Sequence, residues 1–258
     1  GMMGAAILAA KAAVRSGLGL LSCHIPRGER QLIQMAVPEA LVDTDLSESC
    51  FSVLKNAEKY DAVAVGPGLG QKPETVRALK MLLEEWKGPI VLDADALNIL
   101  AAHPALLDRL PEGTILTPHP KEFERLAGKS GNDFERLNKL SIFASRYNVC
   151  ILLKGAHTVI ASPAGKYWFN MTGNPGMAKG GMGDVLTGVI LALSANGMSS
   201  EEAAKCAVYA HGLVGDYMAA EVGERGVYAG LVAENMGKAW YTLELVKNEV
   251  IRNKSQRL

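Results

Sequence analysis

Residues 174–188 form the stretch that most constrains the fold of this chain. They read Asn-Pro-Gly-Met-Ala-Lys-Gly-Gly-Met-Gly-Asp-Val-Leu-Thr-Gly. The first part cannot be regular structure, because proline lacks an N–H and the glycines adopt backbone angles that other residues avoid. From Val185 onward, apolar residues continue for about two turns of helix. The stretch therefore predicts a buried helix that begins at a glycine run.

A helix that begins behind glycines is suited to binding an anion. Its first N–H groups are unpaired and carry partial positive charge, and glycines let an anion approach closely. Asp184 lies at this helix start, where a carboxylate would take a proton from an attacking hydroxyl. The helix dipole favours the ionised form, so we expect Asp184 to be a weak base. The alternative is a flexible loop with Asp184 as a helix cap. The residue order differs from that of a P-loop or a dinucleotide fingerprint.

Composition limits the kind of protein this is. The 258 residues are 48% hydrophobic, which is enough for one large α/β domain with a sizeable core. Lys plus Arg and Asp plus Glu are each 27, so there is no basic field to favour nucleic acid. No apolar stretch reaches the roughly 18 residues of a membrane span, and the four scattered cysteines indicate reduced thiols in a cytoplasmic protein.

Strand and helix patterns alternate along most of the chain. Short apolar runs predict buried strands at 61–66, 89–93, 114–117 and 149–154. A strand at 17–25 and a hairpin of 157–161 with 167–170 are also predicted, whereas the region up to residue 52 is expected to be largely irregular. Helices are expected at 5–15, 29–34, 72–86, 122–127, 133–147, 183–195, 200–221 and 231–246. We expect one domain, residues 1–258, with a doubly wound and mostly parallel sheet.

Polar clusters follow the predicted strands, where ligands bind in such sheets. The glycines of 66–70 would line a substrate or form only a tight turn. Asp93 and Asp95 alternate, so one would face the site while the other caps the next helix. His119 lies between two prolines, which stiffen the loop, and is a candidate ligand contact or a surface histidine. Glu122 would hold Mg²⁺ through water or supply favourable charge at a helix start.

Lys154 ends the most apolar of the predicted strands. A charge at that position is costly unless it meets solvent or an anion. The segment 154–158, Lys-Gly-Ala-His-Thr, therefore indicates contact with a nucleotide phosphate or ribose. The alternative is a lysine that reaches solvent at the edge of the sheet.

The stretch 174–188 resembles the Gly-x-Gly-Asp signature of the ribokinase-like superfamily. Its longer form, Asn-Pro-Gly-Met-Ala-Lys-Gly-Gly-x-Gly-Asp-Val-Leu, resembles the ADP-dependent NAD(P)H-hydrate dehydratase family. Segments at 66–70, 93–98, 116–122 and 153–158 match in the same order. The resemblance implies a ribokinase-like three-layer fold. In that family a strand and a Gly-rich turn precede the Gly-Ala-Ala-x-Leu helix matched by residues 4–8, so we expect this chain to lack that first strand.

The resemblance also implies an activity, in which ADP, or ATP, phosphorylates the hydroxyl of (S)-NADH or (S)-NADPH hydrate and loss of phosphate restores the cofactor. It implies Mg²⁺, a homo-oligomer (a tetramer in the family) and a fused or separate epimerase partner. Asp184 would be the base, and Gly181 and Gly183 would hold the transferring phosphoryl group. The implied nucleotide contacts are Lys154, Gly155, Ala156, His157, Thr158 and Gly183. The implied substrate contacts are Ala6, Gly68, Gly70, His119 and Asp184.

Two other functions remain open at this point. One is a small-molecule kinase of the same superfamily that acts on a vitamin precursor. The segments Pro-His-Pro-Lys-Glu and Asn-Pro-Gly-Met-Ala-Lys argue against it. The other is a non-catalytic nucleotide-binding protein, against which intact Asp184 and Glu122 argue. The residues alone support phosphoryl chemistry on a hydroxyl with a nucleotide.

Overall fold

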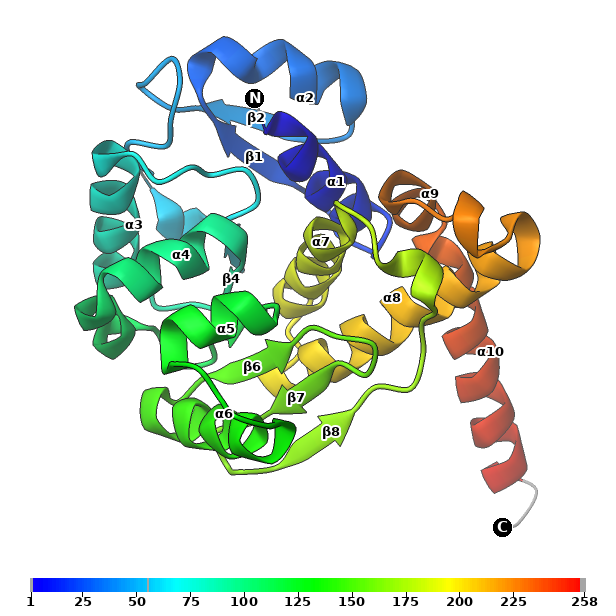
Figure 1. Ribbon diagram of the computed structural model, residues 1–258. Helices are drawn as coiled ribbons and strands as arrows, with labels where there is room; N and C mark the ends of the chain where they lie inside the picture. Colours follow the sequence, from blue (N-terminus) through cyan, green and yellow to red (C-terminus); the bar gives the residue numbers. More distant parts are fainter. Residues whose placement is uncertain (1, 55, 256–258) are drawn as a thin grey trace.

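The main sheet has six strands in the order β3-β4-β5-β6-β7-β8, in a computed structural model that describes residues 2–54 and 56–255 (Figure 1). Strands β3 to β6 pair in parallel, and β7 and β8 continue the sheet antiparallel. The predicted parallel sheet and hairpin are therefore confirmed. The strands are β3 (Val63–Val65), β4 (Ile90–Leu92), β5 (Ile115–Leu116), β6 (Cys150–Leu153), β7 (Val159–Ala161) and β8 (Tyr167–Phe169).

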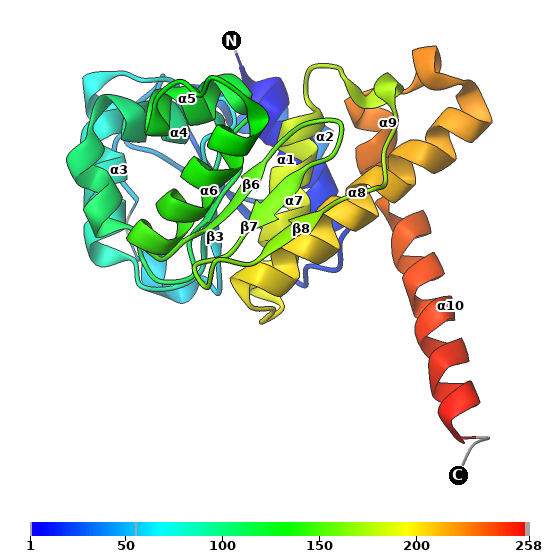
Figure 2. The ribbon, with the colours of Figure 1, turned by 60° about the horizontal axis from the view of Figure 1, so that its bottom comes forward.

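Helices cover both faces of this sheet. Successive residues of a strand point to opposite faces, so each strand contributes side chains to both layers of packing. Val91 of β4 joins the core beneath one layer of helices, whereas its neighbour Leu92 joins the core beneath the other. The first layer contains α1 (Met3–Val14), α7 (Met182–Ala195), α8 (Ser200–Val222), α9 (Ala229–Glu234) and α10 (Met236–Ser255). The second layer contains α3 (Pro73–Glu85), α4 (Ala94–Ala102), α5 (Pro120–Ala127) and α6 (Asp133–Tyr147). Helix α10 projects away from the body of the domain (Figures 1 and 2).

A second, two-stranded sheet lies beside the main one. It pairs β1 (Ser22–Ile25) with β2 (Leu41–Thr44) in parallel, and α2 (Arg30–Ala36) connects them. The predicted strand at 17–25 was too long, because Leu20 is 81% exposed and Gly17 has a positive φ of 87°. Strand β2 was not predicted. Short 3-10 helices span Arg27–Glu29, Ala57–Lys59, Pro104–Arg109, Pro175–Met177 and Glu224–Gly226.

A cavity of about 790 Å³ separates the two sheets. Every residue of β1 and of β3 lines it, and each of these strands pairs with one neighbour, β2 and β4 respectively. Ala6 and Ala9 of α1 and Gly188 of α7 also contribute to its wall. The two helices cross closely, since a Cβ on Gly188 would lie 2.0 Å from the carbonyl oxygen of Ala9. The cavity is thus bounded by two strand edges and a helix pair.

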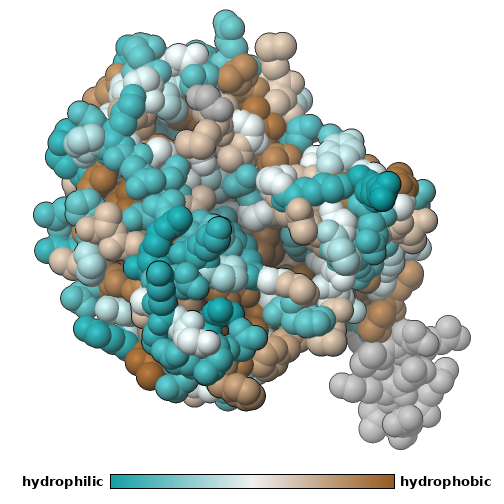
Figure 3. Space-filling model, viewed as in Figure 1, coloured by the Kyte–Doolittle hydropathy of each residue, from teal (hydrophilic) through white to brown (hydrophobic). Residues whose placement is uncertain are grey.

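The surface agrees with the composition. On the face shown in Figure 3, hydrophobic and hydrophilic residues are interspersed. None of the described helices combines the length and apolar character that crossing a membrane requires. All four cysteines are free thiols, as expected. The predicted single domain stays a prediction, and its residues 1, 55 and 256–258 lie outside the described part.

Candidate active site

The glycine turn ahead of α7 has the conformation predicted for it. Gly181 is the residue before the helix and has φ +90°, a region that side chains strongly disfavour. A Cβ there would lie 2.6 Å from Leu8 Cδ1 and 2.9 Å from the Ala229 methyl group. The turn therefore requires glycine both for its backbone angle and for its close contact with α1 and α9.

Two anchors hold the segment that leads into the turn. The Asp216 carboxylate accepts hydrogen bonds from Gly173 N–H and Asn174 Nδ2, both at 2.9 Å. The Lys179 ammonium donates hydrogen bonds to two backbone carbonyl oxygens of residues 224–227. One is Arg225 O, at 2.7 Å, and the other is Val227 O. These contacts fix both ends of a stretch that has little regular structure of its own.

Asp184 lies in the first turn of α7, directly behind the glycines. Burial is the main cause that raises its pKa to about 6; the neighbouring charges of Asp93 and Glu122 act in the same direction, and Lys154 opposes them. The sequence predicts a weak base because the helix dipole favours the carboxylate. That expectation was wrong, since burial and two nearby carboxylates outweigh the dipole. With a pKa of about 6, Asp184 is ionised at neutral pH and can still accept a proton.

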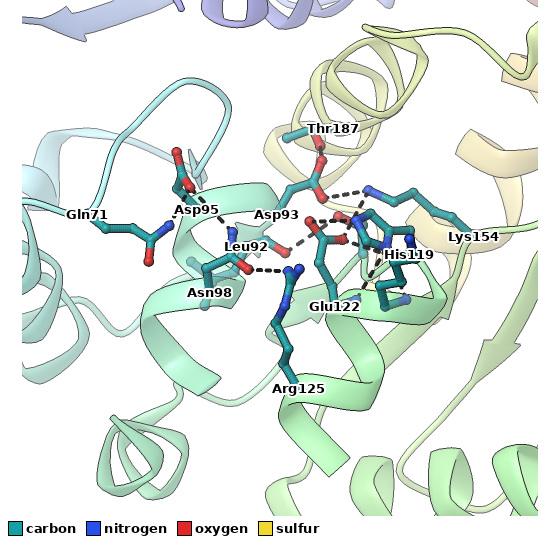
Figure 4. A network of polar contacts seen from close by, with 12 residues as sticks. Gln71, Leu92, Asp93, Asp95, Asn98, His119, Glu122, Arg125, Lys154 and Thr187 are labelled. Atoms are coloured by element: carbon teal, nitrogen blue, oxygen red, sulfur yellow. Dashed lines mark hydrogen bonds and ion pairs between the residues drawn. The ribbon is translucent and has the colours of Figure 1, made fainter. Parts of the chain in front are cut away.

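Lys154 lies next to the glycine turn and is paired with a buried carboxylate. Its Nζ donates to Asp93 Oδ1 at 2.7 Å and is 4.0 Å from Glu122 Oε2 (Figure 4). A Cβ on Gly183 would lie 3.1 Å from the same Nζ. Lys154 is therefore held at the base of the glycine turn and does not reach solvent freely as a snorkelling lysine would.

His119 and Glu122 form a capping box at the start of α5. His119 Nδ1 accepts hydrogen bonds from the N–H groups of Lys121 and Glu122, at 3.1 and 3.2 Å. Glu122 Oε2 accepts from the N–H of His119 at 2.8 Å. Because Nδ1 is an acceptor, the neutral ring carries its proton on Nε2, which lies 3.5 Å from Glu122 Oε1. The histidine is half-exposed and the glutamate is buried.

The charges at this site fit a hydrated Mg²⁺ ion. Three carboxylates, those of Asp93, Glu122 and Asp184, surround one lysine, and all three offer the hard oxygen ligands that Mg²⁺ prefers. Among the described residues, however, no group of three side chains is arranged to bind a metal directly. This arrangement suits an ion that keeps most of its waters and binds mainly through a nucleotide's phosphates.

The remaining predicted contacts lie in three places. Ala6 and Gly68 line the cavity between the sheets. Gly70 N–H donates at 2.9 Å to Asp95 in the first turn of α4. Residues 155–157 form an exposed loop after β6, and Thr158 is buried behind them. The structure therefore brings one group of predicted residues together around the glycine turn: Asp184, Gly181, Gly183, Lys154, Glu122 and His119. The other predicted residues lie elsewhere, Ala6 and Gly68 at the cavity and Gly70 beside α4.

Sequence reasoning missed Thr187 and Asp216 and left Asp93 undecided. Asp93 is only 1% exposed and points into the site, while Asp95 points away toward Gln71 (Figure 4). Thr187 Oγ1 donates to Asp93 Oδ2 at 2.8 Å. A usable signal was present, because Thr187 is three residues after Asp184 and such residues share a helix face.

The fold defines a class of protein, those with the ribokinase-like fold. The hydroxyethylthiazole kinase of Pyrococcus horikoshii, 16% identical, superimposes with a TM-score of 0.62 over 93% of this chain and 94% of its own, which shows the fold alone. A family model described as Carb_kinase, NAD(P)H-hydrate dehydratase, matches residues 1–237. The chain belongs to the NAD(P)H-hydrate dehydratase family.

Relatives at higher identity agree. The ADP-dependent (S)-NAD(P)H-hydrate dehydratase of Bacillus subtilis is 36% identical over 246 residues, covering 94% of this chain and 86% of its own length. A crystal structure of the B. subtilis ADP/ATP-dependent dehydratase, co-crystallised with ATP and Mg²⁺, has a TM-score of 0.80, with 33% identity over 93% of this chain and 85% of its own. The bifunctional NAD(P)H-hydrate repair enzyme Nnr of Moorella thermoacetica is 39% identical over 89% of this chain. The chain spans about half the length of that relative, 45%.

Proposed function

We propose that the protein dehydrates (S)-NADH hydrate or (S)-NADPH hydrate and uses ADP as phosphoryl donor, with AMP and phosphate as products. The observation that carries the proposal is the position of Asp184, a carboxylate of raised proton affinity directly behind a glycine turn and beside Lys154. Family membership supports the choice of substrate.

The first step moves a phosphoryl group to the hydroxyl of the hydrate. The N–H groups of Gly181 and Gly183 would donate hydrogen bonds to the phosphoryl oxygens, because N–H groups at a helix start bind anions. Asp184 would take the hydroxyl proton as the new oxygen–phosphorus bond forms, and AMP would leave as the old one breaks. Lys154 would offset the developing negative charge. When bound, Mg²⁺ supplies further positive charge to the phosphates.

The second step expels that phosphate. The lone pair of the ring nitrogen pushes electrons toward the carbon that bears the phosphate, so the carbon–oxygen bond breaks. A proton then leaves the adjacent ring carbon, and the dihydropyridine is restored. Little help from the protein is needed, which explains how a kinase-like site with one general base would serve as a dehydratase.

Several finer features belong to the same proposal. We place the nucleotide against residues 154–158 and the hydrate near Ala6, Gly68, Gly70 and His119, with Glu122 reaching Mg²⁺ through water. We also propose a cytoplasmic homo-oligomer, in the family a tetramer, that works with a fused or separate epimerase. The bifunctional name of the Moorella relative supports the last point.

The test is a balance of products. The protein is incubated with ADP, Mg²⁺ and (S)-NADH hydrate, and the absorbance of the restored dihydropyridine is followed while AMP and phosphate are measured. We expect equal amounts of NADH, AMP and phosphate. A stable phosphate ester of a vitamin precursor, with the hydrate untouched, would establish the kinase alternative. Absence of nucleotide turnover with every hydroxyl substrate would establish the binding-protein alternative.

A further inference from the structure

The Asp93 carboxylate is the most buried charged group of the site and has no role in the mechanism above. Its two oxygens have separate partners, Lys154 Nζ on Oδ1 at 2.7 Å and Thr187 Oγ1 on Oδ2 at 2.8 Å. Oδ1 accepts its hydrogen bond from the residue that follows β6, and Oδ2 accepts its hydrogen bond from α7. The orientation of the carboxylate is therefore fixed from both sides (Figure 4).

The backbone around Asp93 is equally constrained. Its N–H donates to Val65 O at 3.1 Å, and its carbonyl oxygen lies 1.8 Å from the point that a Cβ on Gly66 would occupy. Ala94, the next residue, has a φ of +48°, an unfavourable value for a residue with a side chain. Strained backbone of this kind persists only where the surroundings impose it, and it is concentrated at functional sites.

The Lys154 ammonium is held more closely by Asp93, at 2.7 Å, than by Glu122, at 4.0 Å. A lysine side chain carries about 2 kcal/mol of rotamer entropy and three rotatable donors. Lys154 is 21% exposed, and its Nζ lies between Asp93 Oδ1, at 2.7 Å, and the glycine turn, where a Cβ on Gly183 would be 3.1 Å away. A buried ion pair is weak evidence for stability, because desolvation offsets most of the attraction. The location of this pair, at the place where a phosphoryl group would bind, is the better guide to its role.

We propose, on the basis of the phosphoryl transfer set out above, that Asp93 is a positioning residue. With Thr187 as its own support, it fixes the Lys154 ammonium against the glycine turn so that the charge faces the transferring phosphoryl group. Asp93 itself touches neither substrate. At pH 8, where Asp184 is ionised, the effect of Asp93 on the reaction passes through Lys154.

The test is a double-mutant cycle with Asp93→Asn and Lys154→Met, each assayed at pH 8. At pH 8, two units above the pKa of about 6, Asp184 is ionised in the unsubstituted protein, and Asp93→Asn removes one of the charges that raise that pKa. We expect Asp93→Asn alone to lower kcat about tenfold to a hundredfold, the cost of misplacing a group by about 1 Å. In the Lys154→Met background, the same change should lower kcat less than about threefold. Equal losses in both backgrounds would overturn the proposal.

A matched pair at Thr187 keeps the proposal testable if a charge-altering variant does not fold. Thr187→Ser retains the hydroxyl and should keep kcat within about twofold. Thr187→Val removes the donor to the buried Asp93 Oδ2, so it should lower the melting temperature and also lower kcat of the folded protein about three- to tenfold. If Val and Ser variants have the same kcat, or if only the melting temperature falls, Asp93 is a structural residue.

Calorimetric binding separates this proposal from the proposed function. Asp93→Asn should weaken ADP binding more than AMP binding, because AMP lacks the phosphoryl group that Lys154 faces. That outcome in a protein without dehydratase activity would support positioning and refute the dehydratase. Normal ADP-over-AMP preference and normal kcat in Asp93→Asn would refute positioning while leaving the dehydratase intact.

Discussion

Asp184→Asn should lower activity and at the same time make the protein more stable at neutral pH. As the proposed base, Asp184 contributes to turnover, and its loss should reduce kcat by about two to four orders of magnitude. The stability effect follows from the cost of keeping a carboxylate ionised in a partly buried place beside two others. Asparagine has nearly the same shape and carries no charge, so it avoids that cost.

The magnitude and its pH dependence follow from the shift in pKa. The folded-state pKa is about 6, against 3.8 for the unperturbed group. Below about pH 4 both states hold the proton and there is no cost. Between the two values the native state binds more protons than the unfolded state, so native stability falls as pH rises. The full cost above pH 6 is at most about 3 kcal/mol, and we take about half of it because the side chain is partly exposed.

The assay is thermal unfolding of both proteins at two pH values. The Asn variant should melt about 3–6 °C above the unsubstituted protein at pH 8 and about half as far above it at pH 5. Asp133→Asn is the matched control, an acid in the first turn of α6 whose side chain is 86% exposed. It should lower the midpoint slightly at both pH values. An Asp184→Asn protein that is no more stable at pH 8 would refute the argument that burial raises the proton affinity of this carboxylate.

Two further predictions concern the same turn. The dehydration rate should be half-maximal near pH 6 and fall about tenfold for each unit below it, because the base must be ionised; a half-maximum near pH 4 would mean that Asp184 is not the titrating base. Gly181→Val should reduce both ADP binding and turnover more than tenfold, owing to the positive φ and the 2.6 Å approach to Leu8. Gly180→Ala, which has open space around it, should stay active, and a folded and fully active Gly181→Val protein would show that the turn binds no anion.

The main sheet could be predicted from the sequence because its strands are buried on both faces. Such strands are continuous apolar runs, as at 89–93 and 149–154, and they end where charge or glycine begins. Strand β2 was missed for the opposite reason. Its residues Leu-Val-Asp-Thr are exposed or only half-buried, so no hydrophobic pattern marks them. The hydrogen bonds that define β2 come from β1, about 20 residues earlier, and local reading does not detect such a partner.

Most residues of the candidate site could be predicted from the sequence, but the interactions between their charges could not. Asp184 and the glycines stand out because polar and flexible residues interrupt an apolar pattern. The pKa of Asp184 depends first on its burial and then on the charges of Asp93, Lys154 and Glu122, which come from three distant segments of the chain. The spacing of Thr187 from Asp184 indicates a shared helix face, but the sequence does not reveal that the Thr187 hydroxyl meets a carboxylate 94 residues away. The sequence thus identified most residues of the site, whereas the raised pKa of Asp184 follows only from the folded arrangement.

The cavity between the two sheets bears on how this protein behaves in concentrated solution. A strand that pairs on one side presents a row of N–H and C=O groups that can recruit a strand from another molecule, and β1 and β3 both have such an edge beside the cavity. Helix α1 lines the cavity with alanines and is packed against α7 by the close contact at Gly188. Any change that loosens α1 would uncover both edges at once. We therefore expect variants that loosen α1 to associate with one another through these edges, although α1 contributes no general acid or base to the chemistry.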